Sequence, residues 1–596
     1  LIEELGLLKM DFLGLRTLTV IQDAEKMVRR KVPDFDITKI DPTDKEVYEM
    51  IGNGHTEGVF QLESSGMKSF MKELKPQNME DIIAGISLYR PGPMDFIPRY
   101  IEGKNHQESI HYECEQMEEI LEPTYGCIVY QEQVMQIVMK LAGYTLGRSD
   151  LVRRAMSKKK GDVMIKERQN FVYGNEEEGI PGCINNGIDE KTANQIWDEM
   201  LDFAKYAFNK SHAAAYAVVA YRTAYLRCHY PVEFMAALLT SVLGNTNKIS
   251  EYSYACKKLG IKILPPDINY GEGAFSVDHG NIRYGLTAIK SLGRPVIEAI
   301  IRERNLNGPY RDFKDLVERL SSKEINKRTV ENLIKSGALD CFHVTRKQQM
   351  IVYASVIDSI QKERKNEIAG QMSLMDLLGE EDQQSFQISY PDVGEYEKEQ
   401  KLAMEKEVLG IYVSGHPLED DIERLERSVT AHTSDFVIDE ETGKTKIHDR
   451  ESCIIGGLIS EMSVKLTKKN QNMAFITLED LRGTVEVVVF PRQYATYQSL
   501  LREDAKVFIK GTTQISEEES KVICNQIISF EDSRQELWVQ FADKEAFFKE
   551  EDALKGILTS YPGKNPVVIY CKTERAVNRL GRDYMVSGDE NLLFDQ

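Results

Sequence analysis

The stretch that decides the fold of the carboxy-terminal part is a series of apolar segments: IIGGLI (454–459), MAFITL (473–478), VEVVVF (485–490), VFIK (507–510) and VICNQII (522–528). Apolar and polar residues alternate within these segments, and Gly483 and Gly511 punctuate them. Such alternation is typical of short strands with one buried face. Five strands in so short a length predict a small closed barrel of the OB-fold type.

Helical spacing dominates the rest of the chain. Residues 15–30 carry apolar side chains at helical intervals, and a helix-rich region from about 51 to 255 is broken by turns that contain Pro and Gly. A smaller unit follows from about 256 to 345, and a charged, Gln-rich stretch from about 361 to 400 predicts an exposed connector. The predicted fold class is multidomain α+β, mainly helical, ending in the barrel and a mixed α/β domain.

Composition limits the function only loosely. The chain has 596 residues and nine cysteines, none of them in a Cys-x-x-Cys pair, which favours reduced thiols in a cytoplasm. No apolar run approaches the roughly 18 residues that a membrane span needs. The start lacks both a Met and a secretory signal, which predicts a fragment of a longer protein. A net charge of −20 disfavours nucleic acid as a partner, but LVRRAMSKKK (151–160) is locally basic.

The segment LLKMDFL (7–13) predicts an apolar strand that carries Asp11. A buried carboxylate needs a cation or a donor. Asp11 is therefore either a metal ligand, as a phosphoryl-transfer site would require, or a turn-capping residue before Gly14. Lys9 projects to the same face of such a strand, where it either meets phosphate charge or faces solvent.

Six segments together resemble the alpha subunit of bacterial DNA polymerase III, the C-family replicative polymerase, in its DnaE-type branch. They are LLKMDFLGLRTLTVIQ (7–22), GVFQLESSGMKSF (58–70), SLYRPGPM (87–94), EPTYGCIVYQEQVMQI (122–137), GYTLGRSDLVRRAMSKKK (143–160) and FNKSHAAAYA (208–217). The resemblance implies a carboxy-terminal fragment that lacks the amino-terminal phosphoesterase-like domain and most of the palm. It divides the chain into the end of a palm (1–50), fingers (51–255), a clamp-binding domain with a helix-hairpin-helix (256–365), a connector with a clamp-binding peptide (366–450), an OB-fold (451–532) and a subunit-binding domain (533–596).

The resemblance implies template-directed DNA synthesis by two-metal phosphoryl transfer to a primer 3′ end. In the family three aspartates hold two Mg²⁺ ions, and Asp11 matches the third. The other two form an Asp-x-Asp pair that would precede residue 1. The segment PDFDI (33–37) looks like this pair, but it follows Asp11 and is interpreted as a solvated turn.

The implied nucleotide contacts are Lys9, Arg153 and Arg154. The implied DNA contacts are Lys158, Lys159, Lys160, Asn209, Lys210, Ser211, His212, Lys290, Lys468 and Lys469. For the basic run the alternative is a solvated loop. Asn209 or Ser211 is expected to cap a helix over 213–227, whose first amides would favour phosphate. Tyr125, Tyr130 and Gln133 line the active cleft or simply pack in the core.

Three further motifs point to DNA and to a clamp. Residues 289–293 with a helix over 295–302 resemble a helix-hairpin-helix in which Ser291 replaces the first glycine, a plain helical hairpin being the alternative. Gln371, Leu374 and Met375 resemble a clamp-binding peptide with Met375 in place of an aromatic residue. Basic groups near Phe475 in the barrel suit single-stranded template, although OB-folds also bind proteins.

The implied partners are primer–template DNA, deoxynucleoside triphosphates, a sliding clamp, a clamp-loader subunit and, as in some members, a proofreading exonuclease, with no membrane. The alternative function is a DNA- and clamp-binding module without activity of its own, because two catalytic aspartates are missing. A DNA ligase would also combine a helix-hairpin-helix with an OB-fold, but the sequence has no Lys-x-Asp-Gly motif.

Overall fold

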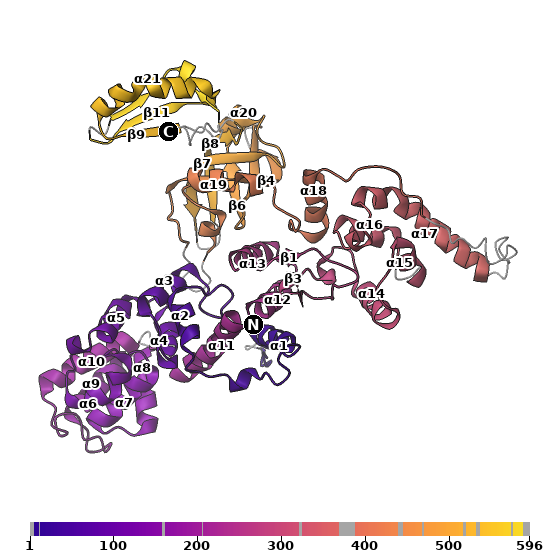
Figure 1. Ribbon diagram of the computed structural model, residues 1–596. Coiled ribbons are helices and arrows are strands. Elements are labelled where there is room, and N and C mark those ends of the chain that lie inside the picture. The colour runs from indigo at the N-terminus through magenta and orange to yellow at the C-terminus, as the bar shows by residue number, and fades with distance from the viewer. Residues whose placement is uncertain are drawn as a thin grey trace. The chain divides into compact units, whose positions relative to one another are not determined.

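The computed structural model describes residues 5–10, 12–157, 161–204, 207–320, 325–368, 388–438, 445–467, 470–516, 520–531, 537–573 and 576–587. The chain divides into two compact units. The first contains Leu1–Glu419, Val437–Lys446 and Leu481–Gly483, and the second contains Asp420–Phe436, Ile447–Asp480 and Thr484–Gln596. Each unit is described by itself (Figure 1).

The first unit is mainly helical. Its helices are α1 (Arg16–Val28), α2 (Lys45–Gly52), α3 (Ser65–Leu74), α4 (Met79–Leu88), α5 (Ile97–Asn105), α6 (Glu115–Leu121), α7 (Gln131–Ala142), α8 (Leu146–Ser157), α9 (Gly161–Tyr173), α10 (Glu190–Ala204), α11 (Lys210–His229), α12 (Pro231–Ser241), α13 (Thr246–Lys258), α14 (Arg294–Asn307), α15 (Phe313–Arg319), α16 (Lys327–Lys335), α17 (Arg346–Ile368) and α18 (Lys398–Leu409).

Two hydrophobic cores hold the helices that surround the candidate site. One joins α6 to α10 around the fully buried Trp197. The other joins α2, α3 and α4 to α11. On α11 the buried alanines Ala213, Ala217, Ala220 and Ala224 recur at helical spacing. Because these side chains are small, α4 packs closely along α11.

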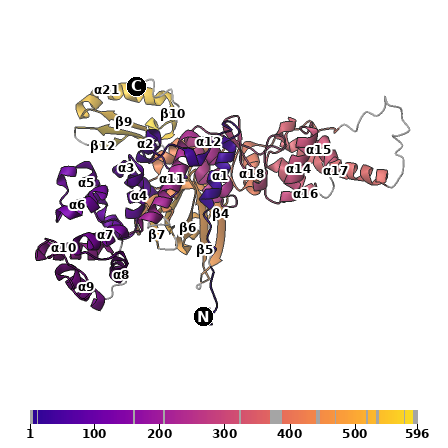
Figure 2. The ribbon, with the colours of Figure 1, turned by 90° about the horizontal axis from the view of Figure 1, so that it is seen from below.

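The third core of this unit joins α1 to α12 and continues through α14 to α17, which lie side by side (Figure 2). A small sheet of order β1-β3-β2 contributes to it, with β1 (Ile263–Leu264), β2 (Ser276–Asp278) and β3 (Asn281–Arg283). His279 and Gly280 turn the β2–β3 hairpin with positive φ angles of 47° and 79°. Such a turn matches the twist of paired antiparallel strands.

Several sequence predictions can be compared directly with these elements. The helix predicted over residues 15–30 is confirmed as α1, and the helix predicted over 213–227 lies within α11. The strand predicted over 7–13 is wrong for its described residues, 7–10 and 12–13, which are irregular and exposed. A strand needs a neighbouring strand, and the sheets of the described residues include no strand from this segment.

The connector predicted over 361–400 is also partly wrong. Its first eight residues, 361–368, continue α17, and α18 begins at Lys398. Charged side chains do not end a helix when they can remain in solvent along its outer face. A polar composition therefore did not distinguish a projecting helix from a connector.

The second unit contains the predicted barrel. Its strands are β4 (Ser452–Leu466), β5 (Asn472–Glu479), β6 (Thr484–Val489), β7 (Lys506–Ile515) and β8 (Ser520–Ser529), closed in the order β4-β5-β6-β8-β7. Side chains that alternate along the strands fill its interior, among them Ile455, Ile476, Val487, Ile509 and Val522. The prediction of a five-stranded OB-type barrel is confirmed.

Gly511 does not form the break between strands that the sequence predicted. It lies inside β7, beside a register shift at Lys510, and not at a strand end. A Cβ atom at this position would be 2.3 Å from Val522 Cγ1 and 2.7 Å from the Ile523 carbonyl oxygen. The glycine is therefore required for close approach of β8, whereas Gly483 does lie between β5 and β6.

The remaining elements of this unit are α19 (Ile422–Ser428), α20 (Pro491–Tyr497), β9 (Leu537–Phe541), α21 (Lys544–Ser560), β10 (Pro562–Asn565), β11 (Val567–Cys571) and β12 (Ala576–Arg579). Strands β9 and β11 are parallel and joined through α21, and β12 pairs antiparallel with β11. Figure 1 shows α21 lying along this sheet. The predicted mixture of helix and strand is confirmed.

Candidate nucleic-acid interface

The centre of the candidate site is the start of α7, where Gln131 and Glu132 follow a bridge between Tyr130 and Phe208. The backbone amide of Gln131 donates to the Phe208 carbonyl (2.9 Å). The Gln131 side-chain Nε2 donates to the Ala207 carbonyl (3.1 Å). These bonds hold the segment that leads into α11 against the start of α7.

The amino terminus of α11 is capped from two sides. Asn209 is the capping residue, because its Oδ1 accepts a hydrogen bond from the His212 amide (2.8 Å). The carboxylate of Glu132 accepts hydrogen bonds from the Lys210 amide (3.0 Å) and from Asn209 Nδ2 (3.0 Å). Ser211, the other predicted cap, is exposed in the first turn.

Glu132 thus occupies the place where the sequence predicted a phosphate. A helix amino terminus favours any anion, since its first amides lack partners within the helix. Here an internal carboxylate supplies that anion. The side chain of Lys210 is also engaged, because its Nζ lies 3.0 Å from a Glu80 carboxylate oxygen and 5.2 Å from the centre of the Tyr130 ring.

A row of rings extends along α11 from this point. The His212 ring is 5.5 Å from the Phe208 ring and 4.2 Å from the Tyr216 ring, measured between centroids. The guanidinium of Arg90 lies 4.4 Å from the centroid of Phe208. His212 and Arg90 are exposed, and Phe208 and Tyr216 are half-buried. Positions 212 and 216 are four residues apart and share one face of α11, and Phe208 precedes the helix in the bridge with Tyr130.

Arg153, on α8, reaches the same corner from the other side. Its Nη1 donates to Gln131 Oε1 (2.8 Å), and its Nε and Nη2 donate to Asp150 Oδ1 (3.0 and 2.6 Å). Arg154 Nη2 lies 2.8 Å from the other oxygen of Asp150. Both predicted nucleotide-binding arginines therefore share one carboxylate, and the hydrogen bonds from Arg153 lower the pKa of Asp150 below its usual value.

The structure thus brings together Arg153, Arg154, Asn209, Lys210 and His212. Of the other predicted site residues, Lys9 is exposed in the irregular segment before α1. Nine predicted site residues lie outside the described residues, and they are Asp11, Lys158, Lys159, Lys160, Gln371, Leu374, Met375, Lys468 and Lys469.

The choice left open for Tyr130 and Gln133 is now decided in favour of packing. Tyr130 is 2% exposed and Gln133 5% exposed. The Gln133 Oε1 accepts hydrogen bonds from the Val129 and Tyr130 amides (2.8 and 3.0 Å). These residues shape the turn into α7. Tyr125 is half-buried.

Sequence reasoning missed Glu80, Arg90, Gln131, Glu132 and Asp150. Asp150 was detectable, because acidic and basic residues three and four positions apart on a helix pair readily. The roles of Gln131 and Glu132 depend on contacts with residues far along the chain, up to 78 positions away, and no local pattern signals them.

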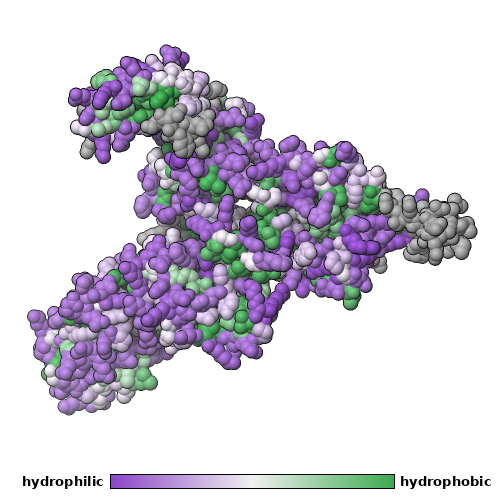
Figure 3. Space-filling model, viewed as in Figure 1, coloured by the Kyte–Doolittle hydropathy of each residue, from purple (hydrophilic) through white to green (hydrophobic). Residues whose placement is uncertain are grey.

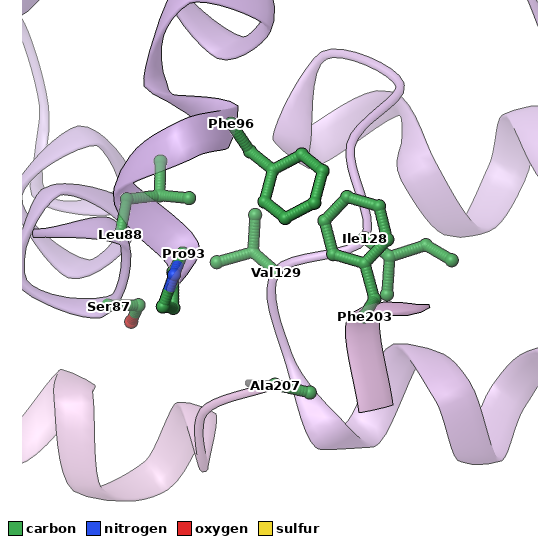
Figure 4. Close-up of a pocket in the computed structure, with 8 residues that line it drawn as sticks. All are labelled: Ser87, Leu88, Pro93, Phe96, Ile128, Val129, Phe203 and Ala207. Carbon is green, nitrogen blue, oxygen red and sulfur yellow. The ribbon is translucent and has the colours of Figure 1, made fainter. Parts of the chain in front are cut away.

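A small apolar void near this region does not suggest another binding site. Over α6–α10 the face seen in Figure 3 is mainly hydrophilic. A small void nearby is lined by apolar side chains in which Phe96 and Phe203 face each other with centroids 4.0 Å apart (Figure 4). Ser87 is its only polar lining side chain, and the hydroxyl donates to the Ile83 carbonyl (2.7 Å). This void does not suit a phosphorylated ligand.

The predicted helix-hairpin-helix turn lies between the short helix Leu286–Ala288 and α14. Ser291, in place of the first glycine, adopts a positive φ of 65°. Gly293 then begins α14 without a side-chain cap. The exposed Lys290 precedes the turn, and its backbone carbonyl accepts a hydrogen bond from Asn332 Nδ2 (2.8 Å). The substitution therefore changes the residue but keeps the left-handed conformation.

In the barrel, Lys465 lies on β4 with its Nζ 4.8 Å from the centroid of Phe475 on β5. Ser463 is the direct cross-strand neighbour of Phe475. A basic group over a half-exposed ring is compatible with stacking and backbone contacts to a single strand.

The fold combines a helical region, a helix-hairpin-helix turn and an OB barrel in one chain, which is the architecture of a multidomain nucleic-acid-binding protein. Residues 17–179 match the bacterial DNA polymerase III alpha subunit finger domain, 260–349 a helix-hairpin-helix motif, and 454–529 an OB-fold nucleic acid binding domain.

Relatives named DNA polymerase III subunit alpha match nearly the whole chain. The Borreliella burgdorferi protein is 40% identical over 89% of this chain and 45% of its own length. The Bacillus subtilis and Escherichia coli K12 proteins are each 37% identical over 100% of this chain and 52% of their own lengths. The chain therefore belongs with the alpha subunits of bacterial DNA polymerase III, and it spans about half the length of these relatives.

Among the described residues, no helix is both long enough and apolar enough to cross a membrane.

Proposed function

We propose that this chain carries the nucleotide- and DNA-facing parts of a template-directed DNA polymerase that acts in the cytoplasm. The observation that carries the proposal is the convergence of Arg153, Lys210 and the ring row of α11 at the Gln131–Glu132 corner. Arginines can grip phosphate oxygens in pairs, and exposed rings can stack on bases. The names of the relatives supply the reaction class.

The reaction would add a deoxynucleotide to a primer 3′ end. Mg²⁺ ions, when bound, would neutralise phosphate charge and activate the attacking hydroxyl. Asp11 would supply one carboxylate to them, and an Asp-x-Asp pair would come from polypeptide before residue 1. Lys9, Arg153 and Arg154 would bind the triphosphate.

The arginines would bind by exchange of partners. In the structure the Asp150 carboxylate lies 2.6 Å from Arg153 Nη2 and 2.8 Å from Arg154 Nη2. A triphosphate carries more negative charge than one carboxylate and offers more acceptor oxygens, so it can replace Asp150 at both. The exchange avoids leaving two adjacent like charges unpaired before the nucleotide arrives.

DNA would contact the chain at three further places. We propose that the amides of the turn at Ser291 bind a backbone phosphate, with Lys290 beside them. The barrel face at Lys465, with Lys468 and Lys469, would bind single-stranded template. The basic run Lys158, Lys159 and Lys160 would neutralise backbone charge. The proposed protein partners are a sliding clamp at Gln371, Leu374 and Met375, a clamp-loader subunit at residues 533–596, and a proofreading exonuclease.

Primer extension with the Asp11→Asn variant of the full-length polymerase tests the proposal. We expect loss of magnesium-dependent extension with primer–template binding largely retained. Asp34→Asn is the matched control, because Asp34 is an exposed aspartate in the turn before α2. Extension that survives Asp11→Asn would contradict the catalytic assignment.

A second candidate function is a binding module without chemistry of its own. The length comparison favours it for the chain taken alone, since the chain spans about half of its relatives. In that case the isolated chain binds primer–template without extending it, and adding the missing polypeptide in the same reading frame restores extension.

A further inference from the structure

A cluster of metal-binding side chains lies at the carboxy-terminal end of α11, away from the candidate nucleotide site at its start. Glu46, Cys228 and His229 each offer one ligand atom, and these atoms lie within 4.8 Å of one another. Cys228 and His229 are half-buried, and Glu46 is exposed at the start of α2. We propose that these three residues bind a thiophilic divalent cation such as Zn²⁺.

Asp44 orients the His229 ring and holds the backbone of Glu46 at the start of α2. Its Oδ2 lies 2.8 Å from His229 Nε2, and its Oδ1 accepts a hydrogen bond from the Glu46 amide (3.0 Å). A carboxylate on one ring nitrogen leaves the other, Nδ1, to coordinate a metal, and such outer carboxylates are a regular feature of histidine–metal sites. The Tyr225 ring, 4.6 Å from the His229 ring, packs on the imidazole and limits its rotation.

The local electrostatics also favour a cation. Negative charge comes from Asp44, from Glu46 and from the carboxy-terminal end of the 20-residue helix α11, where the helix dipole is negative. The guanidinium of Arg227, the residue before Cys228, pairs with Glu57 at 3.4 Å. Within the described residues Glu46 has no ion-pair partner. A metal would join α2 to the end of α11.

The donor set determines the class of metal. One thiolate, one imidazole and one carboxylate suit Zn²⁺ or Co²⁺ in tetrahedral geometry, with solvent in the fourth position. Mg²⁺ and Ca²⁺ prefer oxygen ligands alone, so the site would discriminate against the ions that serve phosphoryl transfer. This inference does not depend on the proposed polymerase function.

The test uses the full chain, freed of metal by a chelator and titrated with Co²⁺. We expect one equivalent to give a thiolate-to-cobalt charge-transfer band, and Zn²⁺ to abolish it by competition. Cys228→Ser should lose the band. Cys114→Ser, a half-buried cysteine elsewhere in the unit, should keep it.

Glu46→Gln guards against a folding artefact, because an exposed side chain in the first turn of a helix is tolerant of change. It should weaken Zn²⁺ binding at least about tenfold, with the unfolding temperature of the metal-free protein lowered only slightly through the lost charge at the start of α2. Zn²⁺ should raise the unfolding temperature of the unaltered chain but not of Cys228→Ser. A missing charge-transfer band, or one that persists in Cys228→Ser, would overturn the proposal.

Discussion

Replacing Glu132 by Gln isolates the charge that caps α11. The variant keeps the size of the side chain and one acceptor oxygen but loses the carboxylate that the Lys210 amide and Asn209 Nδ2 reach at 3.0 Å. A hydrogen bond to a charged acceptor is worth about 1 kcal/mol more than a neutral one. A negative charge at a helix amino terminus adds about 0.3–1 kcal/mol. Because the contacts are partly exposed, we expect the helix start to lose about 1–2 kcal/mol.

Hydrogen exchange of the first turn of α11 measures this loss directly. A destabilisation of about 1–2 kcal/mol makes local opening roughly 5–30 times more frequent. The amides of Lys210 and His212 should therefore exchange faster by about that factor. Glu49→Gln is the control, since Glu49 is an exposed glutamate on α2. Exchange within about twofold of the unaltered chain would refute the assignment of Glu132 as the cap.

The same variant also tests competition between Glu132 and phosphate. In the unaltered chain an incoming phosphate must displace the Glu132 carboxylate, whereas in Glu132→Gln the amides are available to it. Inorganic pyrophosphate should therefore slow the exchange of the Lys210 amide more in the variant than in the unaltered chain. If pyrophosphate protects the two proteins equally, Glu132 does not compete for the phosphate position.

Three further predictions concern stability. Gly511→Ala should lower the unfolding temperature of the barrel, at a cost of about 1–3 kcal/mol, because its Cβ would meet Val522 at 2.3 Å. Gly556→Ala in α21, where a Cβ would meet nothing within 4 Å, should stabilise the protein instead. Equal effects of the two substitutions would contradict the packing argument. Ser291→Gly should slow hydrogen exchange of α14 modestly, since a left-handed non-glycine residue costs about 1 kcal/mol, and faster exchange would count against strain at this turn. Burial raises the pKa of the Cys256 thiol from 9.0 to about 12, so the stability that the buried thiol contributes is complete below pH 9.0 and is lost as the pH rises toward about 12. The unfolding temperature should therefore fall less steeply between these pH values in Cys256→Ala than in the unaltered chain. Parallel curves of unfolding temperature against pH would contradict the assignment.

The features that the sequence predicted well depend on local pattern. Residues 15–30 have helical spacing, and the five barrel segments alternate, so both elements formed where expected. A cap at Asn209 or Ser211 follows from residue chemistry and from their position before an apolar helix, and the structure shows that Asn209 is the cap. The left-handed conformation at Ser291 could be anticipated only from the resemblance, because serine rarely adopts it unaided.

The features that the sequence did not predict depend on neighbours distant along the chain. The segment 7–13 has the composition of a strand, but a strand also requires a partner. The role of Gly511 depends on how closely β8 approaches, which alternation does not reveal. Glu132 lies 77 residues before Asn209, and only the packing of α7 beside the start of α11 brings the carboxylate to the amides.

The internal pairing of these groups is compatible with a proposed phosphate-binding surface on a chain with a net charge of −20. Asp150 holds Arg153 and Arg154, Glu132 holds the start of α11, and Glu80 holds Lys210. Binding at such a surface is an exchange of anions, so its free energy is the difference between two sets of similar contacts. A ligand with several phosphates replaces several carboxylates at once, whereas an isolated phosphate replaces only one. We therefore expect the surface to discriminate by the number and spacing of phosphates more than by charge alone. The affinity of the chain for phosphate, pyrophosphate and triphosphate can be measured in turn. Affinity should rise more steeply along this series than the charge of the ligand does, and the rise should be less steep in Glu132→Gln.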